Sequence, residues 1–455
     1  MKLESIARAI AAALFATLLV AALPAQAQVA APTSHVNVAP LPAPQAAQAK
    51  AAPAFDAEKA TNAYLAQISG AARAKSNAYF EGGYWLILID TLYALAVAAL
   101  LLWSRISAGI RNFAQARTRS RFWQVPIYVA IYTALTAVLS FPLTAYEEFF
   151  REQAYGMSNQ TFGGWFGDFG KEFVIQIVAS MVVLTIIYAV IRAARQTWWL
   201  WGTLVVILFS AFASMIFPVF IAPMFNDYTP LKDGPLKQEI LSLARANEVP
   251  ATNVYEFNAS KQTKRISANV SGFAGTTRIS LNDNLMNRSK NKNEIIAVLG
   301  HEMGHYALGH NYTGFTWFGL VFFVGFAFVN FGFRFLAGVF GGNWDVRTID
   351  DPAGLPAIVA LMAVFFFFAT PVTNTITRVF ESQADLFGVN ATRQPDAFAE
   401  ATLQLSEYRK LDPSPWEEFI FYDHPSGRTR IHMMMQWKAE HLNDCDIKAG
   451  PVSPQ

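Results

Sequence analysis

The sequence is poor in charge and nearly devoid of cysteine. Only 15% of its 455 residues are charged and 53% are hydrophobic, whereas an average soluble protein has about 25% charged residues. This balance excludes intrinsic disorder over most of the chain. The net charge of +2 gives no basic footprint, so we expect no nucleic-acid partner. The lone Cys445 excludes an intramolecular disulfide framework and any Cys-x-x-Cys zinc site. The class of protein that these exclusions leave is a membrane protein with a polar domain.

The N-terminus has the pattern of an export signal. Lys2 and Arg8 form a basic region, residues 9–23 are apolar, and Ala25-Gln26-Ala27 is a small-x-small cleavage site. The apolar core is short for a membrane span of about 20 residues, so we expect cleavage, with an uncleaved anchor as the alternative. Residues 28–55 are rich in Ala, Pro and Gln, which predicts a flexible linker.

Long apolar runs follow, each near the length that crosses about 30 Å of hydrocarbon. They cover residues 84–103, 122–143, 173–193, 197–221, 317–340 and 355–372. One such run could be a buried core helix, but so many in one chain indicate a membrane bundle. We expect six spans, or seven if the N-terminal segment stays in the membrane.

Loop charges predict the side of the membrane that each loop faces. The loop after the first span has no acid and five arginines, namely Arg105, Arg111, Arg117, Arg119 and Arg121, so the positive-inside rule puts it in the cytoplasm. The next loop is acidic, and the one after it carries Arg192 and Arg195. Following this alternation along the chain puts residues 222–313 on the extracytoplasmic side.

The main polar region, residues 226–313, contains His301-Glu302-Met303-Gly304-His305, which fits the pattern HExxH. We expect short strands over 254–257, 266–270 and 278–281, and a helix over 293–310. On a helix, positions i and i+4 share a face, so both imidazoles can bind one zinc. Glu302 would then take a proton from a water whose pKa zinc lowers to about 7. The alternative is a helix with two structural histidines.

A catalytic zinc needs a third protein ligand and an open position. The best carboxylate is Glu381, in a stretch where steps of four, three and four put four polar residues on one helical face: Asn374, Arg378, Glu381 and Asp385. Glu381 would bind zinc, and Asp385 would accept a hydrogen bond from a ligand histidine and fix its tautomer. A solvated helix stripe is the alternative.

Three further residues are candidates near the site. His310 follows His305 by five positions, which turns it away from the face of the pair, so we expect a structural or rim role and not a ligand. His424, followed by Pro425, and Arg430 would hydrogen-bond the tetrahedral oxyanion if they lie near the zinc. Surface residues on a turn are the alternative.

Together these motifs resemble the type I CAAX prenyl protease family of integral-membrane zinc metallopeptidases. The resemblance runs from about Pro142 to Met434 and is carried by residues 217–226, 230–234, 301–310, 378–385 and 424–431. It implies helices that enclose a large intramembrane chamber capped by the zinc domain. It also implies His301, His305 and Glu381 as zinc ligands, Glu302 as the base, and His424 and Arg430 as transition-state and substrate contacts.

The resemblance further implies that a substrate peptide lies extended beside one strand, by β-augmentation. The residues of this substrate strand are Ser267, Ala268, Asn269, Val270 and Ser271. The family usually has Asn-Ala-Tyr-Phe where this chain has Ser-Ala-Asn-Val, a departure that bears on substrate specificity and not on zinc chemistry. The export signal and linker are not features of eukaryotic members, and they indicate a bacterial inner-membrane protein.

The expected fold class is mainly α: a polytopic membrane helical bundle around a chamber, with a small α+β zincin-type metallopeptidase domain. The expected divisions are a signal or anchor (1–27), a linker and N-terminal segment (28–83), four spans (84–221), the HExxH domain (222–316), two spans (317–373) and the third-ligand helix with the C-terminal part of the peptidase (374–455).

The expected function is that of a zinc metalloendopeptidase with one Zn²⁺ per chain, which cleaves a peptide or protein substrate, membrane-associated or lipidated, at the lipid bilayer. A degenerate chamber that binds lipids or peptides without hydrolysis is one alternative. Intact His301, Glu302, His305 and Glu381 argue against it. A prenyl-peptide-specific CAAX processing enzyme is the other alternative, which a comparison of prenylated and plain peptides would separate.

Overall fold

The computed structural model describes residues 55–272 and 277–448, so the expected signal segment lies outside the described residues. All elements below belong to the unit Ala57–Gln455. Within the described ranges, six helices are long and apolar enough to cross a membrane: Gly70–Trp103, Arg121–Ala154, Phe162–Ala193, Trp198–Met224, His310–Trp344 and Pro352–Thr392. The expected six spans and the mainly α class are confirmed.

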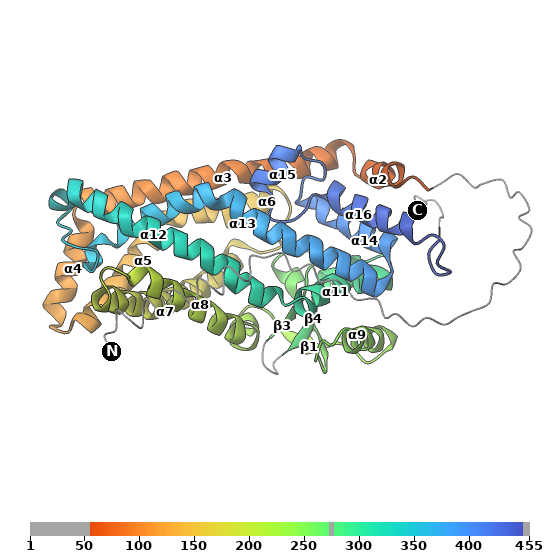
Figure 1. The fold of residues 1–455 in the computed structure, drawn as a ribbon, viewed down its shortest axis with the longest axis horizontal. Helices are drawn as coiled ribbons and strands as arrows, with labels where there is room; N and C mark the ends of the chain where they lie inside the picture. Colours follow the sequence, from red (N-terminus) through yellow and green to blue (C-terminus); the bar gives the residue numbers. More distant parts are fainter. Residues whose placement is uncertain (1–54, 273–276, 449–455) are drawn as a thin grey trace, which may run out of the picture. The chain divides into compact units, whose positions relative to one another are not determined.

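Two groups of elements make up this unit (Figure 1). The spans are built on α3 (Gly70–Trp103), α5 (Arg121–Ala145), α7 (Phe162–Ala193), α8 (Trp198–Ile216), α12 (His310–Trp344) and α13 (Leu355–Thr392). The short α6 (Glu152–Ala154) ends the span that begins with α5, and α4 (Ile106–Arg117) lies between the first two spans in the chain. The remaining elements are α2 (Ala57–Ala66), β1 (Tyr228–Pro230), α9 (Pro235–Ala246), β2 (Val254–Phe257), β3 (Ala268–Ser271), β4 (Arg278–Asn282), α10 (Asp283–Arg288), α11 (Lys292–Ala307), α14 (Pro395–Gln404), α15 (Pro415–Phe421) and α16 (Gly427–Glu440).

The spanning helices are longer than the apolar runs that predicted them. Helix α3 begins at Gly70, well before the expected span at 84, because its polar first turns pack on the C-terminal part of the chain. There Ser76 donates a hydrogen bond to the carbonyl of Arg409, 3.1 Å away. Helix α13 likewise continues past the apolar run and ends at Thr392. It lies beside α3 (Figure 1), so the same two helices serve both the membrane part and the peptidase part.

The sheet is small and mixed, with the strand order β1-β2-β4-β3. Strand β2 pairs with β4 in parallel, whereas β1 and β3 pair antiparallel with their neighbours. The expected strands at 254–257 and 278–281 are confirmed, and the third is shifted to Ala268–Ser271. Strand β3 is therefore an edge strand of this sheet.

A buried arginine fixes one end of the spans. Arg111, on α4, is 2% exposed, and its guanidinium lies 2.6 Å from Asp345 and 2.7 Å from Asp351, on the connection between α12 and α13. Arg195 pairs with Asp350 on the same connection. The arginine-rich loops that follow α3 and α7 thus meet at one end of the bundle. One span, α8, separates the loop after α7 from the region that carries HExxH. The HExxH helix therefore lies at the other end of the bundle.

Candidate metal centre

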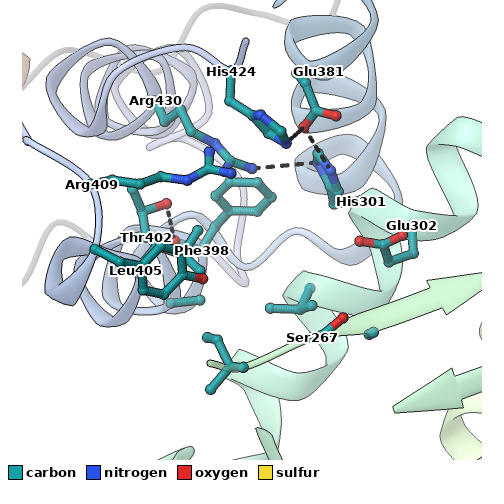
Figure 2. Close-up of a pocket in the computed structure, with 15 residues that line it drawn as sticks. Ser267, His301, Glu302, Glu381, Phe398, Thr402, Leu405, Arg409, His424 and Arg430 are labelled. Carbon is teal, nitrogen blue, oxygen red and sulfur yellow. Dashed lines mark hydrogen bonds and ion pairs between the residues drawn. The ribbon is translucent and has the colours of Figure 1, made fainter. Parts of the chain in front are cut away.

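A cavity of about 220 Å³ lies between β3, α11, α13, α14 and the segment before α16 (Figure 2). It brings together residues that the sequence scatters over more than a hundred positions. Those expected from the sequence are Ser267, Ala268, His301, Glu302, Glu381, His424 and Arg430. Phe398, Thr402, Leu405, Tyr408 and Arg409 also line it, and no motif or spacing in the sequence pointed to them.

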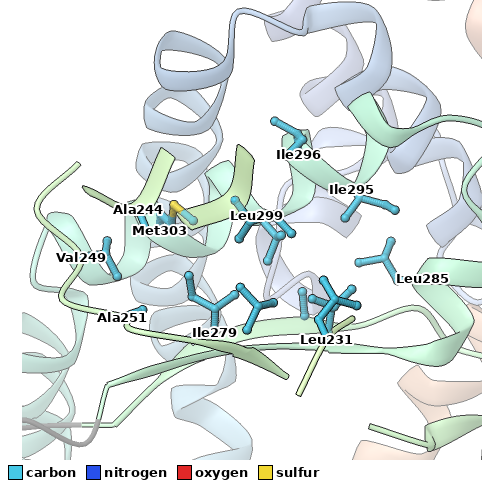
Figure 3. Packing of buried hydrophobic residues seen from close by; sticks show 14 of the residues in the cluster. Leu231, Ala244, Val249, Ala251, Ile279, Leu285, Ile295, Ile296, Leu299 and Met303 are labelled. Carbon is cyan, nitrogen blue, oxygen red and sulfur yellow. The ribbon is translucent and has the colours of Figure 1, made fainter. Parts of the chain in front are cut away.

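Helix α11 holds the HExxH motif over the sheet. Its first turn is capped by Asn291, whose side-chain oxygen accepts hydrogen bonds from the backbone N–H groups of Asn293 and Glu294. Its apolar face, with Leu299 and Met303, packs into the core formed by the sheet and α9 (Figure 3). Because that face is buried, the opposite residues of the motif turn toward the cavity and α13.

Glycines let α11 and α13 approach closely. A Cβ at Gly388 of α13 would lie 2.8 Å from the backbone nitrogen of His301, and one at Gly304 of α11 would lie 3.1 Å from the Cα of Ala384. A Cβ at Gly388 would clash with the backbone of α11, and one at Gly304 would push against the backbone of α13, so glycine at both positions allows this close approach. This contact brings Glu381 to the two histidines, as the expected third-ligand helix requires.

The donor atoms of His301, His305 and Glu381 form a compact cluster, the donor triangle, in which each imidazole faces a different oxygen of the Glu381 carboxylate. His301 Nε2 lies 3.2 Å from His305 Nε2 and 3.3 Å from Glu381 Oε2, and His305 Nε2 lies 3.4 Å from Glu381 Oε1. A tetrahedral zinc with N and O ligands at about 2.0–2.2 Å has ligand-to-ligand edges of about 3.3–3.6 Å. Converging nitrogen lone pairs and a carboxylate repel one another without a cation or proton among them. The donor set therefore fits zinc.

His301 contacts a buried ion pair, Asp385 with Arg430, through its Nδ1. Its Nδ1 lies 2.7 Å from Asp385 Oδ1, and the side chain of Asp385 is completely buried. Arg430 donates to both oxygens of Asp385, through Nε at 2.8 Å and through Nη2. The Asp385 carboxylate accepts the Nδ1 proton of His301, which leaves the Nε2 lone pair directed at the donor triangle.

Glu302 lines the cavity beside the triangle without joining it. Desolvation raises the pKa of its carboxyl, although the neighbouring His301 and His305 act in the opposite direction. A carboxylate with a raised pKa is a stronger base and accepts a proton more readily. The arrangement suits a general base next to a metal and not a further ligand.

His424 reaches the site from the C-terminal segment. Its Nε2 lies 3.4 Å from Glu381 Oε2, and its Nδ1 lies 2.9 Å from Asp423. Among the described residues, no hydrogen bond or ion pair joins Asn374 or Arg378 to the three donor residues. They instead bind backbone carbonyls of α15, with Asn374 donating to Ile420 and Arg378 to Glu418. The two residues thus fix the segment that presents His424.

His310 lies against the metal centre, contrary to the expectation from its spacing. That expectation assumed one helix over 293–310, but α11 ends at Ala307 and Gly309 has a left-handed backbone with φ +65°. The helix is interrupted there, and His310 Nδ1 lies 2.9 Å from His305 Nδ1. Gly309 is the signal that could have revealed this, because a glycine just past a helix often ends it with such a turn.

Family models match almost all of the described chain. Residues 56–227 match the CAAX prenyl protease N-terminal domain, described as five membrane helices, and residues 230–438 match peptidase family M48. Four of the candidate spans lie within 56–227, all of which the structure describes. The membrane part and the peptidase part are therefore both recognised.

Curated relatives and a solved structure agree with these matches. An uncharacterized metalloprotease, YhfN of Bacillus subtilis (strain 168), is 30% identical over 352 residues, which are 76% of this chain and 82% of the relative. A CAAX prenyl protease 1 homolog of Homo sapiens is 26% identical and covers 80% of this chain and 84% of its own. The crystal structure of S. mikatae Ste24p shares the fold, with a TM-score of 0.68 at 22% identity, over 83% of this chain and 95% of that one.

These findings favour an active peptidase over a non-hydrolytic chamber, because the matched family and the named relatives are proteases. Six apolar helices make the chain an integral membrane protein, and the matched peptidase family implies peptide or protein substrates. The chain belongs to peptidase family M48, as a membrane-embedded zinc metalloprotease of the CAAX prenyl protease type.

Proposed function

We propose that this chain is an endopeptidase with one Zn²⁺, held by His301, His305 and Glu381. The observation that carries the proposal is the donor triangle, in which the two imidazole nitrogens lie 3.2 Å apart and 3.3 and 3.4 Å from the two oxygens of Glu381, close enough to share a single tetrahedral ion. Zinc, when bound, supplies polarisation of the scissile carbonyl and acidification of the attacking water. Glu302 takes a proton from that water and returns it to the leaving amine nitrogen.

The remaining cavity residues would bind and orient the substrate. A peptide paired with the edge strand β3 would enter past Ser267 and Ala268, which line the cavity, while Asn269, Val270 and Ser271 continue the strand beyond it. His424 would donate a hydrogen bond to the developing oxyanion. Arg430 lines the same cavity, with Nε and Nη2 engaged by Asp385, which leaves Nη1 as the nitrogen available to the substrate.

An apolar part of the substrate would have a place on the membrane side of the ligands. A second cavity of about 450 Å³ lies between α8, α12 and α13 and is bounded by His305 and Glu381. Its other walls are mainly apolar and include Phe315, Phe318, Phe322 and Phe380. This favours substrates with a membrane-associated or lipidated segment next to the cleaved bond, with a prenyl group accepted but not required.

Metal removal tests this function. Purified protein in nanodiscs should contain one zinc per chain and cleave an unstructured peptide, and dialysis against a zinc chelator should abolish both zinc content and cleavage. Adding zinc back should restore cleavage, since the ligands stay folded on α11 and α13. The same peptide with an isoprenyl group should also be cleaved. Cleavage that persists without metal would contradict the mechanism, and cleavage of the prenylated peptide alone would favour the CAAX-specific alternative.

We propose further that the protein lies in a bacterial inner membrane with the zinc centre on the extracytoplasmic side. The support is electrostatic: the arginine-rich end of the spans would face the cytoplasm by the positive-inside rule. The C-terminal segment belongs to the zinc end, because Arg393 at the end of α13 pairs with Asp444 and Asp446. Between those two acids lies Cys445, which is exposed.

The lone cysteine makes this orientation measurable. In intact spheroplasts, a membrane-impermeant maleimide should label Cys445 in the unaltered chain. The matched control is the Cys445→Ser/Ser104→Cys variant, because exposed Ser104 follows α3 at the arginine-rich end. It should be labelled only after permeabilisation. The reverse labelling pattern would place the zinc centre in the cytoplasm.

A further inference from the structure

The two zinc-binding histidines differ in the group that faces Nδ1, the ring nitrogen that is not in the donor triangle. His301 Nδ1 faces the carboxylate of Asp385, a charged partner. His305 Nδ1 faces another imidazole, that of His310, at 2.9 Å. Metal-binding histidines generally donate the proton of their second nitrogen to a fixed acceptor, which sets the tautomer and the ring orientation. His310 occupies the place of that acceptor for His305.

The position of His310 is tightly fixed. It is the first residue of α12, is 6% exposed, and follows Gly309, which has a left-handed backbone between α11 and α12. Its ring stacks on Phe380 of α13, with centroids 4.8 Å apart and planes at 19°. Its Nε2 lies 3.1 Å from Gln383 Oε1, also on α13. Both ring nitrogens therefore have partners, and the ring has a flat apolar support.

The hydrogen-bond directions follow from the identity of the last partner. Gln383 presents its amide oxygen to His310, and an amide oxygen can only accept, so in this orientation His310 Nε2 carries the proton. Because a neutral imidazole has one N–H, His310 Nδ1 is then an acceptor, and His305 Nδ1 must be the donor. With its proton on Nδ1, His305 has its lone pair on Nε2, the atom in the donor triangle. The opposite direction would place a proton on that ligand atom.

We propose that His310 and Gln383 form an uncharged relay that holds His305 in its zinc-binding tautomer and orientation. They are positioning residues, since they act on the metal only through His305. The inference rests on the proposed zinc site, and it adds two residues to the machinery that a search for ligand motifs does not reveal. It predicts that the relay sets zinc affinity through the direction of its hydrogen bonds.

Zinc affinity of the full-length protein in nanodiscs, measured by competition with a chromogenic chelator, tests the relay. His310→Phe keeps a ring on Phe380 but removes the acceptor, so zinc should bind about 10–100-fold more weakly. His310→Asn should recover much of the loss, because its amide oxygen falls near the former Nδ1 position. Gln383→Glu, which still accepts, should bind zinc nearly as tightly as the wild type, whereas Gln383→Leu should not.

Two controls separate the relay from a general packing effect. His432→Phe makes the same substitution on α16, where the histidine contacts Thr61 and Glu58 away from the zinc centre, and should leave zinc affinity unchanged. The absorption spectrum of the Co²⁺-loaded protein should change in His310→Phe and return toward the wild type in His310→Asn, a change that loosened packing alone would not reverse.

The possible outcomes distinguish this inference from the proposed function. If the wild type binds one zinc and cleaves peptide, but His310→Phe binds zinc as tightly, the relay is refuted and the zinc site stands. A loss in His310→Phe that His310→Asn does not recover also refutes the relay. If the wild type itself binds no zinc, the proposed function fails first.

Discussion

The Glu302→Gln variant is expected to keep its zinc and to lose cleavage, with kcat/KM lower by about 10²–10⁴-fold, the usual contribution of general base catalysis. Glu302 lies outside the donor triangle, so the metal should stay bound. Glutamine has nearly the same size and shape but cannot accept the proton of the attacking water. The measurement pairs initial cleavage rates with zinc content by elemental analysis.

The informative control for this variant is Glu381→Gln. It makes the same chemical change in the donor triangle, where the carboxylate lies 3.3 and 3.4 Å from the two imidazoles, and should lose zinc together with activity. The two variants would thus be equally inactive for different reasons. A Glu302→Gln protein with wild-type activity would remove Glu302 from the mechanism, and one without zinc would make it a ligand.

The Arg430→Met variant is expected to be less stable by about 3–5 kcal/mol, the usual effect of leaving one member of a buried ion pair unpaired. Asp385 is fully buried and Arg430 binds both of its oxygens. Methionine fills a similar volume but leaves the carboxylate charge uncompensated beside His301. Adding Asp385→Asn should restore most of the stability, because the asparagine oxygen still accepts the His301 Nδ1 proton.

Unfolding of the detergent-solubilised, zinc-free proteins would measure this effect, since zinc would add its own stabilisation to each variant. Arg428→Met is the matched control on the same helix. Its arginine pairs with Asp412 at 2.7 Å, but both side chains are about one-third exposed, and such pairs contribute about 0–1 kcal/mol. Equal destabilisation by the two substitutions would show that the buried pair has no special energetic role.

The features of the fold and site that the sequence predicted are those that depend on local periodicity. Spacings of four, three and four placed Glu381 and Asp385 on one face of a helix, and the structure has Asp385 on His301 as expected. The spans were visible because an apolar run of about 20 residues with at most one charge has the length and composition that a membrane helix requires. Their ends were not, since the early turns of α3 are not a long apolar run and pack on the C-terminal segment.

The parts that the sequence did not predict depend on where helices break and cross. The contact of His310 with His305 requires the helix break at Gly309, which a helix extrapolated through residue 310 cannot show. Asn374 and Arg378 share the face of Glu381 but lie two turns and one turn away, where they meet α15. Periodicity gives a common face and leaves open what each residue on it contacts.

The continuity of α13 decides whether this enzyme can be divided. The helix runs unbroken from Leu355 to Thr392, so residue 373, the expected boundary between spans and peptidase, lies in the middle of it. A fragment cut there would begin with half a helix and expose its apolar neighbours, and one cut before it would carry a membrane span. The catalytic part is therefore not a module that can be excised, made soluble or exchanged between proteins. Any inhibitor screen or crystallisation effort must work with the chain in its lipid or detergent.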